Sequence, residues 1–219
     1  MNFTQDLIKH VVKSVTGGLK ITYQGTEIDF SKPIKKLTLA DAIKQHTGID
    51  IDTINTEDEF KSIIKSKKLK LDLTEVVGLG ACFDQLYKEY VRPKIIEPTF
   101  MCDYPSEMIA LAKRHPHDPK KIASFQLVVC GTELLKAYNE VNDPKDQSDR
   151  WLSEVELAKK GSEIASQFDH DYIRALEYGM PPTAGWGMGI DRFTQFITDQ
   201  PTIKDVILFP SMRSEIRDK

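Results

Sequence analysis

The stretch Gly185-Trp186-Gly187-Met188-Gly189-Ile190-Asp191-Arg192 decides the fold of this chain. Three glycines alternate with three large apolar residues, and alternate side chains of a strand point to opposite faces. We therefore expect the apolar residues to anchor one face in a core, while the glycines leave the other face bare. A planar ligand such as a nucleotide base could then lie directly on the backbone. The alternative is an ordinary core strand that happens to contain glycine.

The spacing of apolar residues changes after this strand. Ile190, Phe193, Phe196 and Ile197 fall on one face of a helix, and Arg192 falls on another. The sequence thus predicts a bare strand that runs into a helix with a guanidinium at the junction. A guanidinium there suits stacking on a base or contact with a phosphate.

Composition sets limits on the protein class. The 219 residues are 40% hydrophobic and 29% charged, with a net charge of -3, so there is no chain-wide basic surface for nucleic acid. The three cysteines are far apart and form no metal-type pair. No apolar run approaches the ~18 residues of a membrane span, and the first residues lack the basic start of a signal peptide. We expect a cytoplasmic protein with reduced thiols.

The rest of the chain predicts an α+β fold, a mostly antiparallel sheet flanked by helices. A first helix capped by Thr4 ends at Gly17-Gly18, and a hairpin follows over residues 19–30. A helical insertion covers about residues 38–93, with Thr38 and Thr56 as helix caps. The sheet and the glycine stretch occupy residues 95–219.

Three strands are expected in this last part, over residues 95–103, 125–129 and 133–140. Two helices follow, with Asp143 and Asp169 as their caps. The segment His115-Pro116-His117-Asp118-Pro119 could be a metal cluster, but its prolines favour a polar loop.

The strand over residues 133–140 carries charged side chains with a possible chemical role. Strict alternation places Lys136, Tyr138 and Glu140 on one face. Tyr138 could then wall the stem of a long cationic ligand, and Glu140 could pair with its ammonium group. Glu133 falls on the opposite face unless the strand bulges between residues 133 and 136. A carboxylate there could bind Mg²⁺. The alternative is a two-sided hairpin whose charges are simply solvated.

Several of these segments resemble one enzyme family. Residues 182–192 together with residues 202–210 resemble the third signature motif of class II aminoacyl-tRNA synthetases, with wording similar to that of lysyl-tRNA synthetases. Residues 20–31, 97–105 and 125–143 also resemble segments of lysyl-tRNA synthetases. The resemblance covers essentially all 219 residues and implies the C-terminal half of a class II catalytic domain.

The resemblance implies lysine–tRNA ligase activity: ATP and Mg²⁺ are used to activate lysine, and the lysyl group passes to tRNA(Lys). It implies that Arg192 and Glu133 are catalytic and bind ATP, and that Glu133 holds the magnesium. It implies that Tyr138 and Glu140 recognise the lysine side chain. Gly187 and Gly189 match the motif unchanged and are expected beside the substrates.

Two positions depart from the family pattern. Gln126 stands where the family has a second metal-binding Glu, and Lys136 stands where it usually has an Asn near the lysine. Gln126 removes one negative charge from the expected ATP and metal site. Lys136 places a positive charge near a positive substrate, unless it turns toward a phosphate.

Motifs 1 and 2 of the class and the anticodon-binding domain have no counterpart in these 219 residues. We therefore expect weak activity or none from this chain alone, and a homodimer only for a full-length enzyme. Two alternatives stay open: a non-catalytic module that binds nucleotide or lysine, and a synthetase paralogue that aminoacylates a non-tRNA acceptor.

Overall fold

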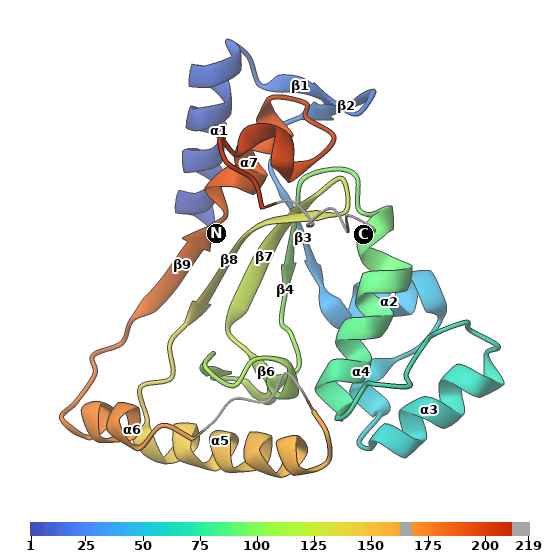
Figure 1. The fold of residues 1–219 in the computed structure, drawn as a ribbon, viewed down its shortest axis with the longest axis vertical. Helices are drawn as coiled ribbons and strands as arrows, with labels where there is room; N and C mark the ends of the chain where they lie inside the picture. The colour runs from blue at the N-terminus through green and yellow to red at the C-terminus, as the bar shows by residue number, and fades with distance from the viewer. Residues whose placement is uncertain (163–167, 212–219) are drawn as a thin grey trace, which may run out of the picture. The chain divides into compact units, whose positions relative to one another are not determined.

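The computed structural model of the protein describes residues 1–162 and 168–211 (Figure 1). Within them the chain forms two compact units. The first contains residues 34–187 together with Met1. The second contains residues 2–33 and the chain from Met188 onward. Among the described residues no helix combines the length and the apolar composition needed to cross a membrane.

The first unit is built on a five-stranded sheet with the order β3-β4-β7-β8-β9. Its strands are β3 (Lys35–Thr38), β4 (Thr99–Cys102), β7 (Ser124–Val129), β8 (Thr132–Asn139) and β9 (Ala184–Met188). The pairs β4–β7 and β7–β8 are antiparallel, whereas β3 and β4 are parallel. The expected α+β fold with a mostly antiparallel sheet is therefore confirmed.

Helices lie beside β3 and β4 at one edge of this sheet, and two more lie beyond one end of its strands (Figure 1). The insertion contains α2 (Leu39–Thr47), η1 (Ile51–Thr53), α3 (Glu57–Ser66) and α4 (Leu79–Leu86). A π-helical turn η2 (Tyr87–Val91) and a 3₁₀ turn η3 (Arg92–Lys94) continue α4. Further along the chain come η4 (Ser106–Met108), α5 (Pro144–Lys159) and α6 (His170–Glu177). The core between the sheet and the insertion is apolar, with Phe60, Leu86 and Met101 fully buried.

Most helix ends follow the expected capping chemistry. Thr38 accepts from the backbone N–H of Asp41, and Thr56 forms a complete capping box with Glu59. Asp143 and Asp169 cap α5 and α6. The prediction for the first helix was wrong: α1 (Asn2–Thr16) begins before Thr4, which lies 2% exposed inside it. Thr4 faces the core of the second unit, so burial outweighs its capping preference.

The second unit joins the first residues of the chain to its last described ones. It contains α1, the hairpin β1 (Lys20–Tyr23) and β2 (Thr26–Asp29), α7 (Ile190–Ile197) and η5 (Ile203–Val206). Phe196 contacts Tyr23 and Phe30, with ring centroids 5.0 and 6.1 Å apart. These aromatic contacts hold the hairpin against α7.

Three features were not expected from the sequence. β3 was part of no predicted strand, and the expected strand over residues 95–103 is confined to β4. The polar loop at residues 115–119 is the turn of a small hairpin, β5 (Arg114–His115) and β6 (Asp118–Ile122). No group of three or more potential metal ligands occurs in the described parts of the chain, so the metal reading of this segment has no support there.

Candidate functional site

A bulge in β8 decides which side chains share a face. Gln126 lies opposite Lys136 and Leu127 opposite Leu135, but Val128 lies opposite Glu133. Leu134 is therefore an extra residue, and the alternation shifts by one at this point. Glu133 consequently joins Gln126 and Lys136, and all three line one cavity. The bulge that the sequence required between residues 133 and 136 is present.

We call this hollow the Gln126 cavity, and its volume is about 690 Å³. The strands β7 and β8 form one wall through Gln126, Glu133 and Lys136. The remaining walls come from the start of α4, from η4 and from α5. The start of α4 packs closely on η4 at Gly80, because a Cβ there would collide with the backbone carbonyl of Glu107.

Tyr104 holds Gln126 in a fixed orientation. The Tyr104 hydroxyl donates to Oε1 of Gln126 at 2.7 Å, and the two residues are 1% and 8% exposed. Burial, with the nearby Tyr87 and the charge of Glu133, raises the pKa of Tyr104 well above its ordinary value of 10.0. Tyr104 therefore stays protonated and keeps donating at neutral pH. Nothing in the sequence marked Tyr104 as a partner of Gln126.

The sheet wall of the Gln126 cavity offers few oxygen ligands to a metal ion. Glu133 is the only carboxylate on its sheet wall, and the amide oxygen of Gln126 is engaged by Tyr104. Lys136 places an ammonium group directly across the strands from Gln126. Mg²⁺ favours carboxylate and other oxygen ligands, and the sheet wall offers one carboxylate beside a cation. Gln126 and Lys136 thus leave Glu133 as the one carboxylate on the sheet wall for the expected magnesium site, which stays a prediction.

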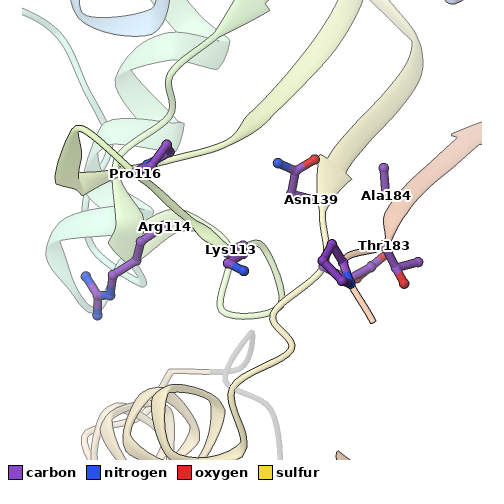
Figure 2. Close-up of a pocket in the computed structure, with 8 residues that line it drawn as sticks. Lys113, Arg114, Pro116, Asn139, Thr183 and Ala184 are labelled. Atoms are coloured by element: carbon purple, nitrogen blue, oxygen red, sulfur yellow. The ribbon is translucent and has the colours of Figure 1, made fainter. Parts of the chain in front are cut away.

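Glu140 lies in a second hollow, which we call the Glu140 cavity (Figure 2). Its volume is about 420 Å³. Figure 2 shows Asn139 at the end of β8 and Thr183 and Ala184 at the start of β9, with Lys113 across the hollow. The backbone N–H of Glu140 donates to the Thr183 carbonyl at 2.9 Å, which joins the two strands at this point.

The side chain of Glu140 occupies a defined place in this cavity. Its carboxylate lies directly against Gly185, where no Cβ intervenes. Burial raises the pKa of Glu140 above its ordinary value of 4.5. The Lys113 ammonium donates to Oδ1 of Asn142 at 2.7 Å, so it is engaged elsewhere. A partly desolvated carboxylate of this kind is a suitable partner for a cationic ligand.

Tyr138 lies close to Glu140. It is partly buried and packs against the core, and its pKa is raised by burial and by the charge of Glu140. Lys136, by contrast, lines the Gln126 cavity rather than the Glu140 cavity. The expected common face of Lys136, Tyr138 and Glu140 therefore spans two cavities, and β8 itself ends at Asn139.

The three glycines of the opening stretch are not equivalent. Gly185 is covered by Glu140, whereas a Cβ at Gly187 would meet nothing within 4 Å. Gly187 therefore provides the bare backbone that was expected. Gly189 belongs to the second unit, where it precedes α7 and would bring a Cβ to 3.5 Å from Cβ of Arg192. Arg192 lies in the first turn of α7, at the expected strand–helix junction.

The apolar residues of this stretch do not anchor it as predicted. Trp186 is 40% exposed and Ile190 is 64% exposed. The core contacts of α7 come instead from Phe193 and Phe196, which are 5% and 1% exposed. Phe196 lies against Tyr23 and Phe30, whereas Ile190 is the first residue of α7 and stays exposed.

Comparison with known proteins agrees with this arrangement. The sequence profile described as tRNA synthetases class II (D, K and N) matches residues 1–213. The chain is 43% identical over 215 residues to the lysine–tRNA ligase of Clostridium acetobutylicum, covering 97% of this chain and 42% of that protein. It is 44% identical over 213 residues to the lysine–tRNA ligase of Carboxydothermus hydrogenoformans, covering 97% of this chain and 43% of that protein.

A third relative, the lysine–tRNA ligase of Aromatoleum aromaticum, is 43% identical over 216 residues, which cover 98% of this chain and 43% of that protein. The chain thus spans about two fifths of the length of these curated relatives. Because the family profile matches almost the whole sequence, the chain belongs to the class II tRNA synthetases of the D, K and N group.

Proposed function

We propose that this chain is part of the catalytic domain of a lysine–tRNA ligase, which activates lysine with ATP and transfers it to tRNA(Lys). The match to the family over residues 1–213, with lysine–tRNA ligases as relatives, carries this proposal. In it, Glu140 binds the ammonium group of lysine, and Tyr138 packs against the aliphatic stem. Gly187 leaves room for substrate, and Glu133, Gln126, Gly189 and Arg192 belong to the ATP site.

The geometry of the Glu140 cavity supports lysine as the amino acid. The carboxylate of Glu140 is partly desolvated, and a charge-assisted hydrogen bond to an ammonium group is strong in such a place. Aspartate would bring a second negative charge to it, and asparagine would offer only a neutral amide. Among the amino acids D, K and N, only lysine complements this carboxylate.

The reaction asks this protein mainly to position groups and neutralise charge. These 219 residues supply the third signature motif, but their sequence contains no counterpart of motifs 1 and 2. Loss of one preorganised charge contact costs about 10²–10³ in rate. We therefore propose weak activity or none for the chain alone. For a full-length enzyme of the relatives' length, we propose a cytoplasmic homodimer that transfers the lysyl group to tRNA(Lys).

Calorimetry on the 219-residue chain tests the choice of amino acid. We expect L-lysine to bind and L-aspartate and L-asparagine not to bind. Glu140→Gln should weaken lysine binding by about ten- to a hundredfold, because it removes the charge from a charge-assisted hydrogen bond. Glu27→Gln is the control, since Glu27 pairs with Lys20 in the exposed hairpin. Preference for aspartate or asparagine, or unchanged lysine binding in Glu140→Gln, would contradict the proposal.

A second candidate function is a non-catalytic module that binds nucleotide or lysine. The cross-strand pair of Gln126 and Lys136 favours it, because this pair leaves Glu133 as the one carboxylate on the sheet wall. ATP–pyrophosphate exchange and tRNA charging, measured together, separate these two candidates and the paralogue with another acceptor. Exchange with charging supports the ligase, exchange without charging supports the paralogue, and binding without exchange supports the module.

A further inference from the structure

Lys136 is a cation in the wall of the Gln126 cavity, and its ammonium group has no hydrogen-bond or ion-pair partner among the residues that the structure describes. We propose that Lys136 contacts a phosphate group of the nucleotide and supplies positive charge that a divalent cation would otherwise bring. This inference rests on the proposed function for the presence of a nucleotide. It concerns how this chain holds the phosphates.

The first argument comes from the neighbours of Lys136. Gln126, directly across the strands, is neutral, and its oxygen is taken by the Tyr104 hydroxyl. Glu133 is the one carboxylate on this wall, so Mg²⁺ held there would take its other oxygen ligands from water and from the phosphates. The Lys136 ammonium is fixed to the same wall, where it can meet a phosphate oxygen directly and repels a divalent cation.

The second argument comes from the other charges that line the cavity. Lys88 pairs with Asp84 at 2.5 Å, so its charge is already compensated. Glu156 pairs with Lys159 at 2.6 Å. Glu107 and Glu154 make the walls formed by η4 and α5 negative. Lys160 also lines the cavity, after the end of α5, so on the sheet wall an anion is expected beside Lys136, where a compact ammonium group suits phosphate as a point charge.

The third argument is that Lys136 and Glu140 line different cavities. A cationic side chain bound by Glu140 does not have to share a cavity with the Lys136 ammonium. The positive charge at position 136 is thus compatible with a cationic amino acid.

The test is ATP binding to the 219-residue chain, measured by calorimetry once with Mg²⁺ and once with excess chelator. We expect binding to persist in chelator, and Lys136→Gln to weaken it there by about ten- to a hundredfold, the usual range for a hydrogen bond to a charged group. Lys136→Arg should retain binding, because it keeps the charge. Lys88→Gln is the matched control, since Lys88 lines the same cavity but is ion-paired, and it should change binding by less than about fivefold.

A second variant tests the replacement of metal by lysine. The pair Gln126→Glu with Lys136→Asn should bind ATP tightly only when Mg²⁺ is present, because it exchanges a cation for a carboxylate. Thermal melts of each variant show whether the fold is retained. A structural role for Lys136 would change the melts but not the dependence on Mg²⁺.

Two results would overturn the inference. The first is ATP binding by the unchanged chain that requires Mg²⁺ and is unaffected by Lys136→Gln; the proposed function would then still stand. The second is the absence of ATP binding in either condition. Lysine binding and its loss in Glu140→Gln are measured separately, so they judge the proposed function whatever the outcome for Lys136.

Discussion

The carboxylate of Glu140 lies against Gly185, in the space that a Cβ at position 185 would occupy. This relationship explains why one of the three alternating glycines is needed. Gly185→Ala should displace the carboxylate and weaken lysine binding by about ten- to a hundredfold, because small misplacements of a binding group are costly. Gly18→Ala is the control, since Gly18 lies outside the proposed site and a Cβ there would have its nearest contact at 4.0 Å. Calorimetry and thermal melts distinguish the two, and equal lysine affinity in Gly185→Ala would contradict the expectation.

The raised pKa of Glu140 predicts a pH dependence of ligand binding. Its carboxyl must be ionised to bind an ammonium group, and burial puts its pKa above 4.5. Lysine affinity should therefore fall on acidification at a higher pH than for an ordinary glutamate. Because the folded pKa exceeds the unfolded one, the contribution of Glu140 to stability is present at low pH and is lost as the pH rises through the folded pKa. Titrations with lysine from about pH 8 to pH 5, repeated on Glu140→Gln, check this, since the variant lacks the titrating group.

Gly80 is predicted to be essential for the packing of α4. A Cβ there would collide with the backbone carbonyl of Glu107, which cannot move as a side-chain end can. Gly80→Ala should lower the free energy of unfolding by about 1–3 kcal/mol through overpacking. Gly18→Ala serves as control, because its nearest contact would be at 4.0 Å. Chemical denaturation measures both, and a Gly80→Ala protein as stable as the parent would refute the close contact.

Arg150 is predicted to fasten α5 to the segment before β5. Its guanidinium donates to the Ala112 carbonyl at 2.7 Å and pairs with Asp146 at 3.0 Å, and the residue is 6% exposed. Arg150→Met should cost about 3 kcal/mol, the range for breaking a buried pair. Arg114 pairs with the same Asp146 from a more exposed position, so Arg114→Met should cost less than about 1 kcal/mol. Equal losses in urea unfolding would show that burial does not set the difference.

Asp199 is predicted to stabilise the second unit through Gln24. One carboxylate oxygen accepts from the backbone N–H of Gln24 at 2.6 Å and from its side-chain amide at 2.9 Å. Asp199→Ala should lower the free energy of unfolding by about 0.5–1.5 kcal/mol, a typical net value for lost hydrogen bonds. Asp199→Asn keeps an acceptor oxygen and tolerates the local φ of 55°. It should recover most of the stability in thermal melts, and a loss equal to that of the alanine variant would argue against these bonds.

Much of the secondary structure followed from local chemistry. Thr38, Thr56, Asp143 and Asp169 predicted helix starts because each offers an oxygen to its own backbone within three residues. The turn at Gln24-Gly25 and the strand–helix junction at Arg192 were likewise predicted from residues that are neighbours in the sequence. Failures were also physical: Thr4 is buried inside α1, and β3 pairs with a strand more than sixty residues further along the chain.

The sequence by itself determined the family of the chain, its α+β class and the alternation of side chains along the strands. It also showed that Glu133 can share a face with Lys136 only if the strand bulges between them. Only the tertiary structure decided that the bulge falls at Leu134, that Tyr104 occupies the oxygen of Gln126 and that Lys136 and Glu140 line separate cavities. The reason is that capping and alternation depend on neighbours in the chain. Burial, strand register and the space left by a missing Cβ depend on segments that meet only when the chain folds.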